Sequence, residues 1–510
     1  MRQGRGTAAI VSVGMLLCLV AAPAQANSAR IVAEQRVKPR VVELTIATPA
    51  FAGPTKVDVD LPTGYDSAPD RRWPVTYFLA GTMNTYRSFN SVVDGVKLTE
   101  AYPSILVSPN GDSGYWSDWY NGGAFGPPMY ETYVVDQLIP LIDAHFRTVR
   151  RRSQRAVMGV SMGGYGAMMV AARHPDLFGA AASLSGAVDS NLAANGAVLS
   201  ASPEFQGAQA DAIYGPRATQ EVRWRGHNPT DLADNLRSLD LQVRSADGIP
   251  NPGIGEQPAS ADTPSCIVEG GVYMASVDLH DALDGLHIPH LWDDYGPGCH
   301  TPANFTREIV DTLAVFTKDF AHPPATPGTF AFRSAEPAFD VWGWHVSADP
   351  RRALEFLRLD EVSARGLTLV GSGMTTVTSP PLFRGLRRIG LSGAAPGVAT
   401  PDAAGRIRFT VDLGPADTDQ QYTPGARMAQ VSRTVSFEPV AVIRIARVRS
   451  TRGGVRFCAR AVTMRLTTRT TCRRLPGARS GSLVVSGRDR FGHRVSGRRA
   501  IRFGRVADGS

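Results

Sequence analysis

The chain up to about residue 322 alternates short apolar runs with stretches of helical periodicity. The runs, rich in β-branched residues, lie at residues 41–47, 57–61, 75–79, 104–108, 156–160, 180–184, 239–245 and 290–295. Apolar residues recur at helical spacing in residues 130–146 and 162–173. This alternation predicts an α/β fold with a mostly parallel sheet flanked by helices.

The pattern changes at residues 322–328, where Pro323, Pro324 and Pro327 can continue neither a helix nor a central strand. Beyond this linker, β-type runs at 339–346, 367–370, 406–411 and 435–446 alternate with Gly- and Pro-rich turns, as in β-sandwich modules. We therefore expect an α/β domain at 27–322, an immunoglobulin-like β domain at 323–430 and an Arg-rich β domain at 431–510. The join between the last two is expected near residues 425–434.

Residues 1–26 predict a secretory signal. Arg2 and Arg5 form a basic start, residues 7–22 an apolar run, and residues 24–26 a small-residue cleavage site. The alternative is an uncleaved membrane anchor, which the short run and the cleavage motif disfavour. We expect a secreted, extracellular protein.

Four cysteines remain after the leader, which contains Cys18. An even number in an exported chain predicts two disulfides. Cys458 with Cys472 closes a short loop inside the last domain, which leaves Cys266 with Cys299.

Charge is concentrated at the C-terminal end. Residues 441–510 contain 18 Arg, no Lys and two acidic residues, a local charge of +16 in a chain whose net charge is +8. This cationic segment is interpreted either as a well-solvated surface or as a site of adhesion to an anionic cell envelope. Nucleic acid is not expected as a partner, because the chain is exported.

A G-x-S-x-G motif surrounds Ser161, with Gly159 and Gly163 two residues to either side. It follows an apolar run and opens a helical stretch. That context is typical of a nucleophile elbow, in which a tight strand-to-helix turn exposes the serine. A merely structural turn is the alternative.

A serine hydroxyl needs a base within hydrogen-bond reach and an acid that orients the base. His300 lies in a Gly/Pro loop directly after the last predicted strand, where a base following the serine in chain order is expected. The other candidates, His227, His280, His287 and His290, lie in positions that suit this role less well.

The acid is expected to be Glu269. Apolar residues at helical spacing predict an amphipathic helix over residues 266–286, with Glu269 on its first turn and Cys266 on the same side. A disulfide from Cys266 to Cys299 would tie this helix to the loop that carries His300. The alternatives are a helix-start carboxylate with no catalytic part, and Asp247 as the acid.

Two backbone N–H groups are expected to bind the oxyanion of the tetrahedral intermediate. One belongs to Met162, directly after the serine, and the other to Thr82, in the loop after residues 75–79. A metal site formed by Cys266, Cys299, His300 and Glu269 is disfavoured because no close-spaced ligand pair accompanies it, so no cofactor is expected.

Residues from about 40 to 320 resemble the esterase D group of α/β-hydrolases, which includes the secreted mycolyltransferases of actinobacteria. The resemblance is carried by the elbow and by YFLAG at 77–81, SDWY at 117–120, HPDLF at 174–178, SLSG at 183–186, EG at 269–270 and GCH at 298–300. SDWY and EG are the most specific of these.

The resemblance implies an α/β-hydrolase fold and a triad of Ser161, Glu269 and His300, with Thr82 and Met162 as oxyanion donors. It also implies that Asp118 and Trp119 lie near the cleft, although a packing role for this pair is an equal alternative.

The chain departs from the mycolyltransferases at two places. Their oxyanion loop carries an acid and a base that contact trehalose, whereas this chain has Ala80 and Met83; their catalytic histidine is usually followed by Ser or Asp and then Trp, whereas Thr301 and Pro302 follow His300. These departures disfavour trehalose recognition but not acyl-ester chemistry.

We therefore expect a secreted serine carboxylic ester hydrolase that acts on an acyl ester or lipid through an acyl-enzyme. Two alternatives stay open. One is an acyltransferase that moves an envelope lipid acyl group to a sugar, and the other is an inert hydrolase fold displayed at the cell surface by the β-rich region.

Overall fold

The computed structural model describes residues 28–501 except residues 125, 257–262, 440–441, 452–453, 463–470, 477–480 and 489–493. The predicted leader, residues 1–26, lies outside the described residues. None of the helices within these limits is long and apolar enough to cross a membrane.

The first domain is built on a nine-stranded sheet with the strand order β1-β2-β3-β5-β4-β6-β7-β8-β9. Strands β5, β4, β6, β7, β8 and β9 are parallel, and β1, β2 and β3 are joined to them in antiparallel pairs. The strands are β1 Arg30–Lys38, β2 Val41–Ala47, β3 Thr55–Asp60, β4 Val75–Leu79, β5 Ile105–Pro109, β6 Arg155–Val160, β7 Ala180–Leu184, β8 Asp240–Ser245 and β9 Leu291–Asp294. The mostly parallel sheet confirms the predicted fold class.

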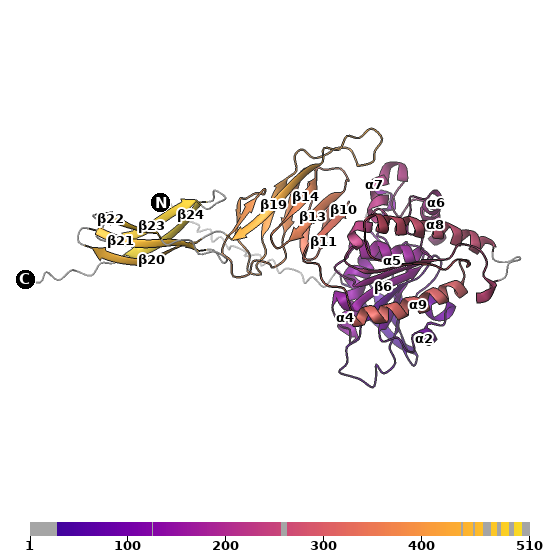
Figure 1. Ribbon diagram of the computed structural model, residues 1–510. Coiled ribbons are helices and arrows are strands. Elements are labelled where there is room, and N and C mark those ends of the chain that lie inside the picture. The colour runs from indigo at the N-terminus through magenta and orange to yellow at the C-terminus, as the bar shows by residue number, and fades with distance from the viewer. Residues whose placement is uncertain are drawn as a thin grey trace, which may run out of the picture.

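Helices cover both faces of this sheet (Figure 1). They are α1 Ser88–Val92, α2 Gly95–Leu98, α3 Tyr130–Thr132, α4 Ile139–His145, α5 Met162–Arg173, α6 Ala193–Ala201, α7 Arg217–His227, α8 Thr263–Gly285 and α9 Pro302–Ala321. The predicted helix at 130–146 is continuous only because a π-helical segment, Tyr133–Leu138, joins α3 to α4.

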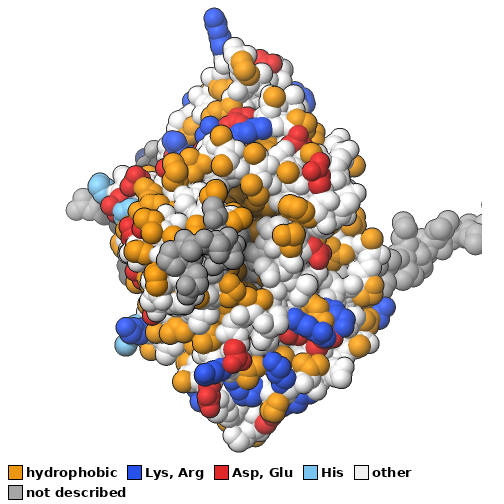
Figure 2. Space-filling view, turned by 90° about the vertical axis from the view of Figure 1, so that its right-hand side faces the viewer, with side chains coloured by type: hydrophobic (Ala, Val, Ile, Leu, Met, Phe, Trp, Pro, Cys, Tyr) orange, Lys and Arg blue, Asp and Glu red, His pale blue; other side chains and the backbone are white. Residues whose placement is uncertain are grey.

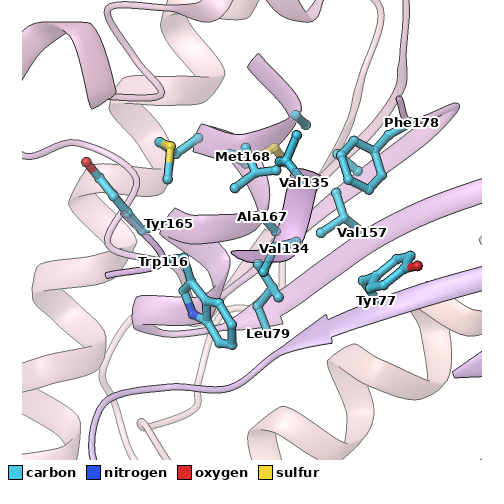
Figure 3. Packing of buried hydrophobic residues seen from close by; sticks show 14 of the residues in the cluster. Tyr77, Leu79, Trp116, Val134, Val135, Val157, Tyr165, Ala167, Met168 and Phe178 are labelled. Carbon is cyan, nitrogen blue, oxygen red and sulfur yellow. The ribbon is translucent and has the colours of Figure 1, made fainter. Parts of the chain in front are cut away.

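Covering both faces explains why the central strands are buried at nearly every position and mainly apolar. All five residues of β4 are buried. Tyr77 and Leu79 belong to the core that includes α4, α5 and α8, whereas Phe78 belongs to the core on the opposite face with α1 and α9. Figure 3 shows the first of these cores, in which the ring of Tyr77 meets that of Phe178 edge-on at 6.5 Å.

The second domain packs a six-stranded sheet against a four-stranded sheet. Its strands are β10 Phe330–Ser334, β11 Ala338–Val341, β12 Trp344–Ser347, β13 Leu357–Ser363, β14 Gly366–Gly371, β15 Met374–Thr378, β16 Ile389–Ser392, β17 Val398–Ala399, β18 Arg408–Asp412 and β19 Val431–Pro439. Strand β19 pairs with both β14 and β16. The boundary expected near residues 425–434 was therefore placed too early, because Val431–Pro439 completes this sandwich.

The last module contains a three-stranded and a two-stranded antiparallel sheet. Its strands are β20 Val442–Thr451, β21 Gly454–Val462, β22 Thr471–Pro476, β23 Gly481–Arg488 and β24 Arg494–Ile501. Cys458 and Cys472 are direct partners across β21 and β22 and form the predicted disulfide.

The sandwich contacts the α/β domain at the C-terminal end of α5. Asn235 and Arg333 exchange two hydrogen bonds of 2.9 and 3.0 Å, and Arg173 at the end of α5 pairs with Glu336 at 3.0 Å. Ser161 precedes the first residue of α5. A helix of this length spans roughly 18 Å, so the sandwich leaves the Ser161 end free.

Arg173 also holds a buried carboxylate, which predicts a large cost for its removal. Its Nε donates to Glu131 Oε1 at 2.7 Å. Burial by itself would raise the pKa of Glu131, but Arg173 and His174 together hold it well below its ordinary value. We expect Arg173→Ala to lower the free energy of unfolding by about 3–5 kcal/mol, because it leaves this charge buried without a partner.

Urea denaturation followed by tryptophan fluorescence measures the change. Arg36→Ala, which removes an exposed pair with Asp66, is the matched control and should cost less than about 1 kcal/mol. Equal losses in the two variants would contradict the structural role given to Arg173.

Candidate active site

Ser161 occupies the tight turn between β6 and α5. Its backbone has φ 58° and ψ −124°, a conformation that is costly for a residue with a side chain. The chain passes so close here that a Cβ on Gly159 would lie 2.2 Å from the carbonyl oxygen of Gly163. The turn thus has the geometry of a nucleophile elbow, and it needs glycine beside the serine.

Glu269 and His300 are hydrogen-bonded to each other. Glu269, in the second turn of α8, is fully buried, and its Oε2 lies 2.7 Å from His300 Nδ1. A carboxylate only accepts hydrogen bonds, so Nδ1 carries the proton and Nε2 keeps a free lone pair. The helix begins three residues earlier than predicted, at Thr263.

Three donors surround the other oxygen of Glu269. Its Oε1 accepts from Ser185 Oγ at 2.6 Å, from Ser245 Oγ at 3.0 Å and from the N–H of Ala246 at 2.9 Å. These residues follow or end β7 and β8, the next two strands after β6 in the sheet order. Donors of this number stabilise the charged form of a buried carboxylate.

The predicted Cys266–Cys299 disulfide is present beside this pair. Cys266 lies one turn before Glu269, and Cys299 directly precedes His300. The His300 N–H also donates to Ser265 O at 3.1 Å. The segment that carries the acid is thus linked covalently to the loop that carries the base.

The competing candidates have other partners. The Asp247 side chain bonds to the backbone nearby, where its Oδ1 accepts a hydrogen bond from the N–H of Ile249 at 2.8 Å. His227 is buried against Arg223 O, and His280 pairs with His290. The structure therefore brings Glu269, and not Asp247, to His300.

The loop after β4 lies against Ser161. A Cβ on Gly81 would be 3.1 Å from the Ser161 Cβ, and Thr82 is the next residue. The buried indole N–H of Trp116 donates a hydrogen bond to Ala80 O at 3.2 Å and so holds this loop in place. On the other side, Met162 begins α5, where the helix dipole favours negative charge.

Asp118 and Trp119 have the contacts of packing residues. Asp118 accepts hydrogen bonds from the N–H and Oγ1 of Thr132, at 3.0 and 2.5 Å, and it borders a pocket with Arg173, at the end of α5 far from Ser161. Burial raises the pKa of Asp118 to about 6. Trp119 is buried, and its indole donates to Gly114 O at 3.2 Å. We therefore assign to both residues the packing role that was the alternative to a place near the cleft.

Glu308 is a second buried carboxyl group that sequence reasoning missed. It lies on α9, and its Oε1 is 2.9 Å from Ser185 Oγ. Burial, and then the charge of Glu269, raise its pKa well above the ordinary value. A signal existed in the sequence, because Glu308 falls next to Ile309 in the apolar stripe of an otherwise amphipathic helix.

A neutral Glu308 would fix which hydrogen bonds the Ser185 hydroxyl donates and which it accepts. The Ser185 hydroxyl has one proton, and it lies close to both carboxyl groups. If Glu308 is protonated it donates to Ser185 Oγ, and Ser185 then donates to the charged Glu269. The order of donors leads from Glu308 through Ser185 to Glu269.

Ser161 is partly exposed. Figure 2 shows a hollow with hydrophobic side chains around it on the face of the first domain that lies opposite the sandwich. Met83, next to Thr82, is 71% exposed.

Comparison with known proteins finds esterases among those that this region resembles. Residues 48–248 match the family model described as "Putative esterase". An esterase of Mycobacterium tuberculosis is 29% identical over 298 residues, which are 57% of this chain and 62% of that protein. The chain thus covers about three fifths of the length of this relative.

Two further similarities involve mycobacterial proteins. The diacylglycerol acyltransferase/mycolyltransferase Ag85B of Mycobacterium avium is 29% identical over 189 residues, 36% of this chain and 54% of that protein. The crystal structure of Mycobacterium tuberculosis MPT51 aligns with a TM-score of 0.45 at 18% identity, over 56% of this chain and 99% of that chain.

The protonation of Glu308 makes a testable prediction about stability. Above pH 4.5, the ordinary pKa of this group, the unfolded glutamate ionises while the folded one stays neutral. Folding then takes up a proton, and stability falls as the pH rises. Glu308→Gln lacks this proton, so we expect it to gain stability relative to wild type from about pH 4 to 7. Urea denaturation at several pH values measures the difference, and a constant difference would contradict a neutral Glu308.

Proposed function

We propose that the chain is a secreted serine ester hydrolase acting through an acyl-enzyme, in line with the match of residues 48–248 to an esterase family model and with the mostly parallel sheet. Ser161 is the nucleophile, His300 the general base and Glu269 the acid that orients it. The observation that carries this proposal is the 2.7 Å contact between His300 Nδ1 and a fully buried Glu269.

Catalysis proceeds in two steps, formation of an acyl-enzyme on Ser161 and its hydrolysis by water. Ser161 Oγ attacks the ester carbonyl carbon as His300 Nε2 takes its proton, and Glu269 stabilises the imidazolium. The N–H groups of Met162 and Thr82 bind the oxyanion. The C–O bond to the alcohol then breaks, and His300 returns the proton to the leaving alkoxide. In the second step water, activated by His300, releases the acid and restores Ser161.

Water is the acceptor that the loop beside Ser161 favours. Ala80 and Met83 offer no charged group to the hydroxyls of a sugar. Transfer of the acyl group to a sugar is the second candidate, supported by the similarity to a mycobacterial acyltransferase. The substrate class common to both candidates is an acyl ester or lipid.

The Arg-rich module supports a partner outside the catalytic domain. The pairing of β20, β21 and β22 places Arg456, which is exposed, opposite both Arg449 and Arg474. Like charges at facing positions of a sheet are unfavourable without a counter-ion. This arrangement fits adhesion of an exported protein to an anionic cell envelope.

Variants of the proposed triad test the enzymatic proposal. We expect Ser161→Ala to lower kcat/KM for a short-chain nitrophenyl ester by about 10⁴-fold or more. Glu269→Gln should lower it by about 10²–10⁴-fold, because the imidazole loses its orientation. Asp247→Asn, the matched control, should stay close to wild type.

Two outcomes would contradict this assignment. A large loss in Asp247→Asn with none in Glu269→Gln would transfer the acid role to Asp247. No difference between Ser161→Ala and wild type would favour an inert protein displayed at the cell surface.

The fate of the acyl group separates hydrolysis from transfer. We expect the free carboxylic acid to be the main product of a nitrophenyl ester, both without a sugar and with a large excess of trehalose or glucose. Chromatography with mass detection of the products measures this partition. Acylated sugar as the main product would replace hydrolase by acyltransferase.

A further inference from the structure

Helix α8 and the segment from residue 290 to residue 300 run side by side and are joined along their length. The pairs in contact are Cys266 with Cys299, Glu269 with His300, Tyr273 with Asp294, and His280 with Trp292. The disulfide lies at one end of this contact. The opposite end is formed by the last turns of α8 and the residues before β9.

At that opposite end three side chains with metal-binding atoms converge. They are His280 and Asp284, one helical turn apart on α8, and His290, which directly precedes β9. One nitrogen of each histidine and a carboxylate oxygen all lie within 4.8 Å of one another. We propose that this cluster binds a divalent transition-metal ion of the Zn²⁺ class.

The hydrogen bonds of His290 prepare it as a ligand. Its Nδ1 lies 2.8 Å from the carbonyl oxygen of Ile288, so this nitrogen carries the ring proton. Nε2 therefore carries a lone pair, which accepts a hydrogen bond from His280 Nδ1 at 2.7 Å and becomes available to an ion when this proton leaves. A carbonyl that fixes the remote nitrogen of the ring is the usual support of a metal-bound histidine.

The ring of His280 is held in place by Trp292. The two rings are stacked, with centroids 5.0 Å apart and planes 11° from parallel. Asp284 follows at i+4, which puts its carboxylate on the same side of the helix. Two of the three ligands are thus positioned before an ion arrives.

The local charge favours a cation. The last turn of α8 contains no basic residue, and Asp281 and Asp284 add negative charge where the helix dipole is already negative. Arg237 donates to Leu286 O at 3.0 Å, but its guanidinium is paired with Asp234. A bound cation would neutralise this end of the helix.

The donor set selects the class of ion. Two imidazole nitrogens and one carboxylate suit Zn²⁺ and its neighbours, whereas Ca²⁺ and Mg²⁺ prefer oxygen donors alone. Tetrahedral Zn²⁺ places two ligand nitrogens about 3.3 Å apart. The rings of His280 and His290 therefore separate slightly when the ion replaces the proton they share.

The role of the ion is to clamp α8 to the start of β9. Together with the disulfide at the other end, it fixes the two segments that carry Glu269 and His300. Binding of the ion is measured directly and does not depend on esterase activity.

The test is a calorimetric titration of untagged, chelator-treated protein with ZnCl₂. We expect one ion per chain and a higher melting temperature with Zn²⁺ present. His290→Ala and Asp284→Asn should each weaken binding at least about tenfold. Titration with Co²⁺ should give visible absorption bands that are lost in the same variants.

His287→Ala is the matched control, because His287 is exposed, lies between Asp284 and His290 in the sequence and is outside the cluster. This variant should bind Zn²⁺ like wild type. Asp284 is also exposed, so Asp284→Asn keeps the test valid if His290→Ala does not fold. No binding of Zn²⁺ by wild type at millimolar concentration, or equal binding by wild type and Asp284→Asn, would overturn the proposal.

Discussion

A fully buried carboxylate stays charged only when the fold replaces the water it has lost, and the site around Ser161 depends on this condition at Glu269. Ser185, Ser245 and the N–H of Ala246 supply three donors to one oxygen, which leaves the other for His300. The ends of β7 and β8, the two strands that follow β6 in the sheet order, thus supply these donors. The elbow and the donors to Glu269 are built on one sheet, and Glu269 itself lies on α8.

The domain arrangement keeps this edge of the sheet accessible. The sandwich binds the opposite end of α5, where Arg173 joins carboxylates of both domains. The first two domains therefore share a partly buried charge network that lies about a helix length from Ser161. The contact orients the β-rich region without covering Ser161.

Much of the catalytic domain could be predicted from sequence because its central strands are buried on both faces and form mainly apolar runs in the sequence. The elbow at Ser161, the disulfide partners and the contact of Glu269 with His300 follow from local motifs and chain order. Strand β1 was missed because Arg30–Lys38 is an exposed edge strand of mixed polarity. Glu308 was missed because its proximity to Ser185 depends on how α9 packs on β7.

The β-rich region could be predicted only in outline. Short strands separated by Gly- and Pro-rich turns indicate a sandwich, but pairing between distant strands is not encoded locally. Val431–Pro439 pairs with β14 and β16 from earlier in the chain, and no local feature separates it from the strands that follow.

Covalent labelling tests most directly whether the Glu269–His300 pair activates Ser161. Wild-type protein is treated with a fluorophosphonate probe, and its peptides are mapped by mass spectrometry. We expect one adduct per chain, on Ser161, formed much more slowly in Glu269→Gln. An adduct on another residue, or equal rates in the two proteins, would contradict this expectation.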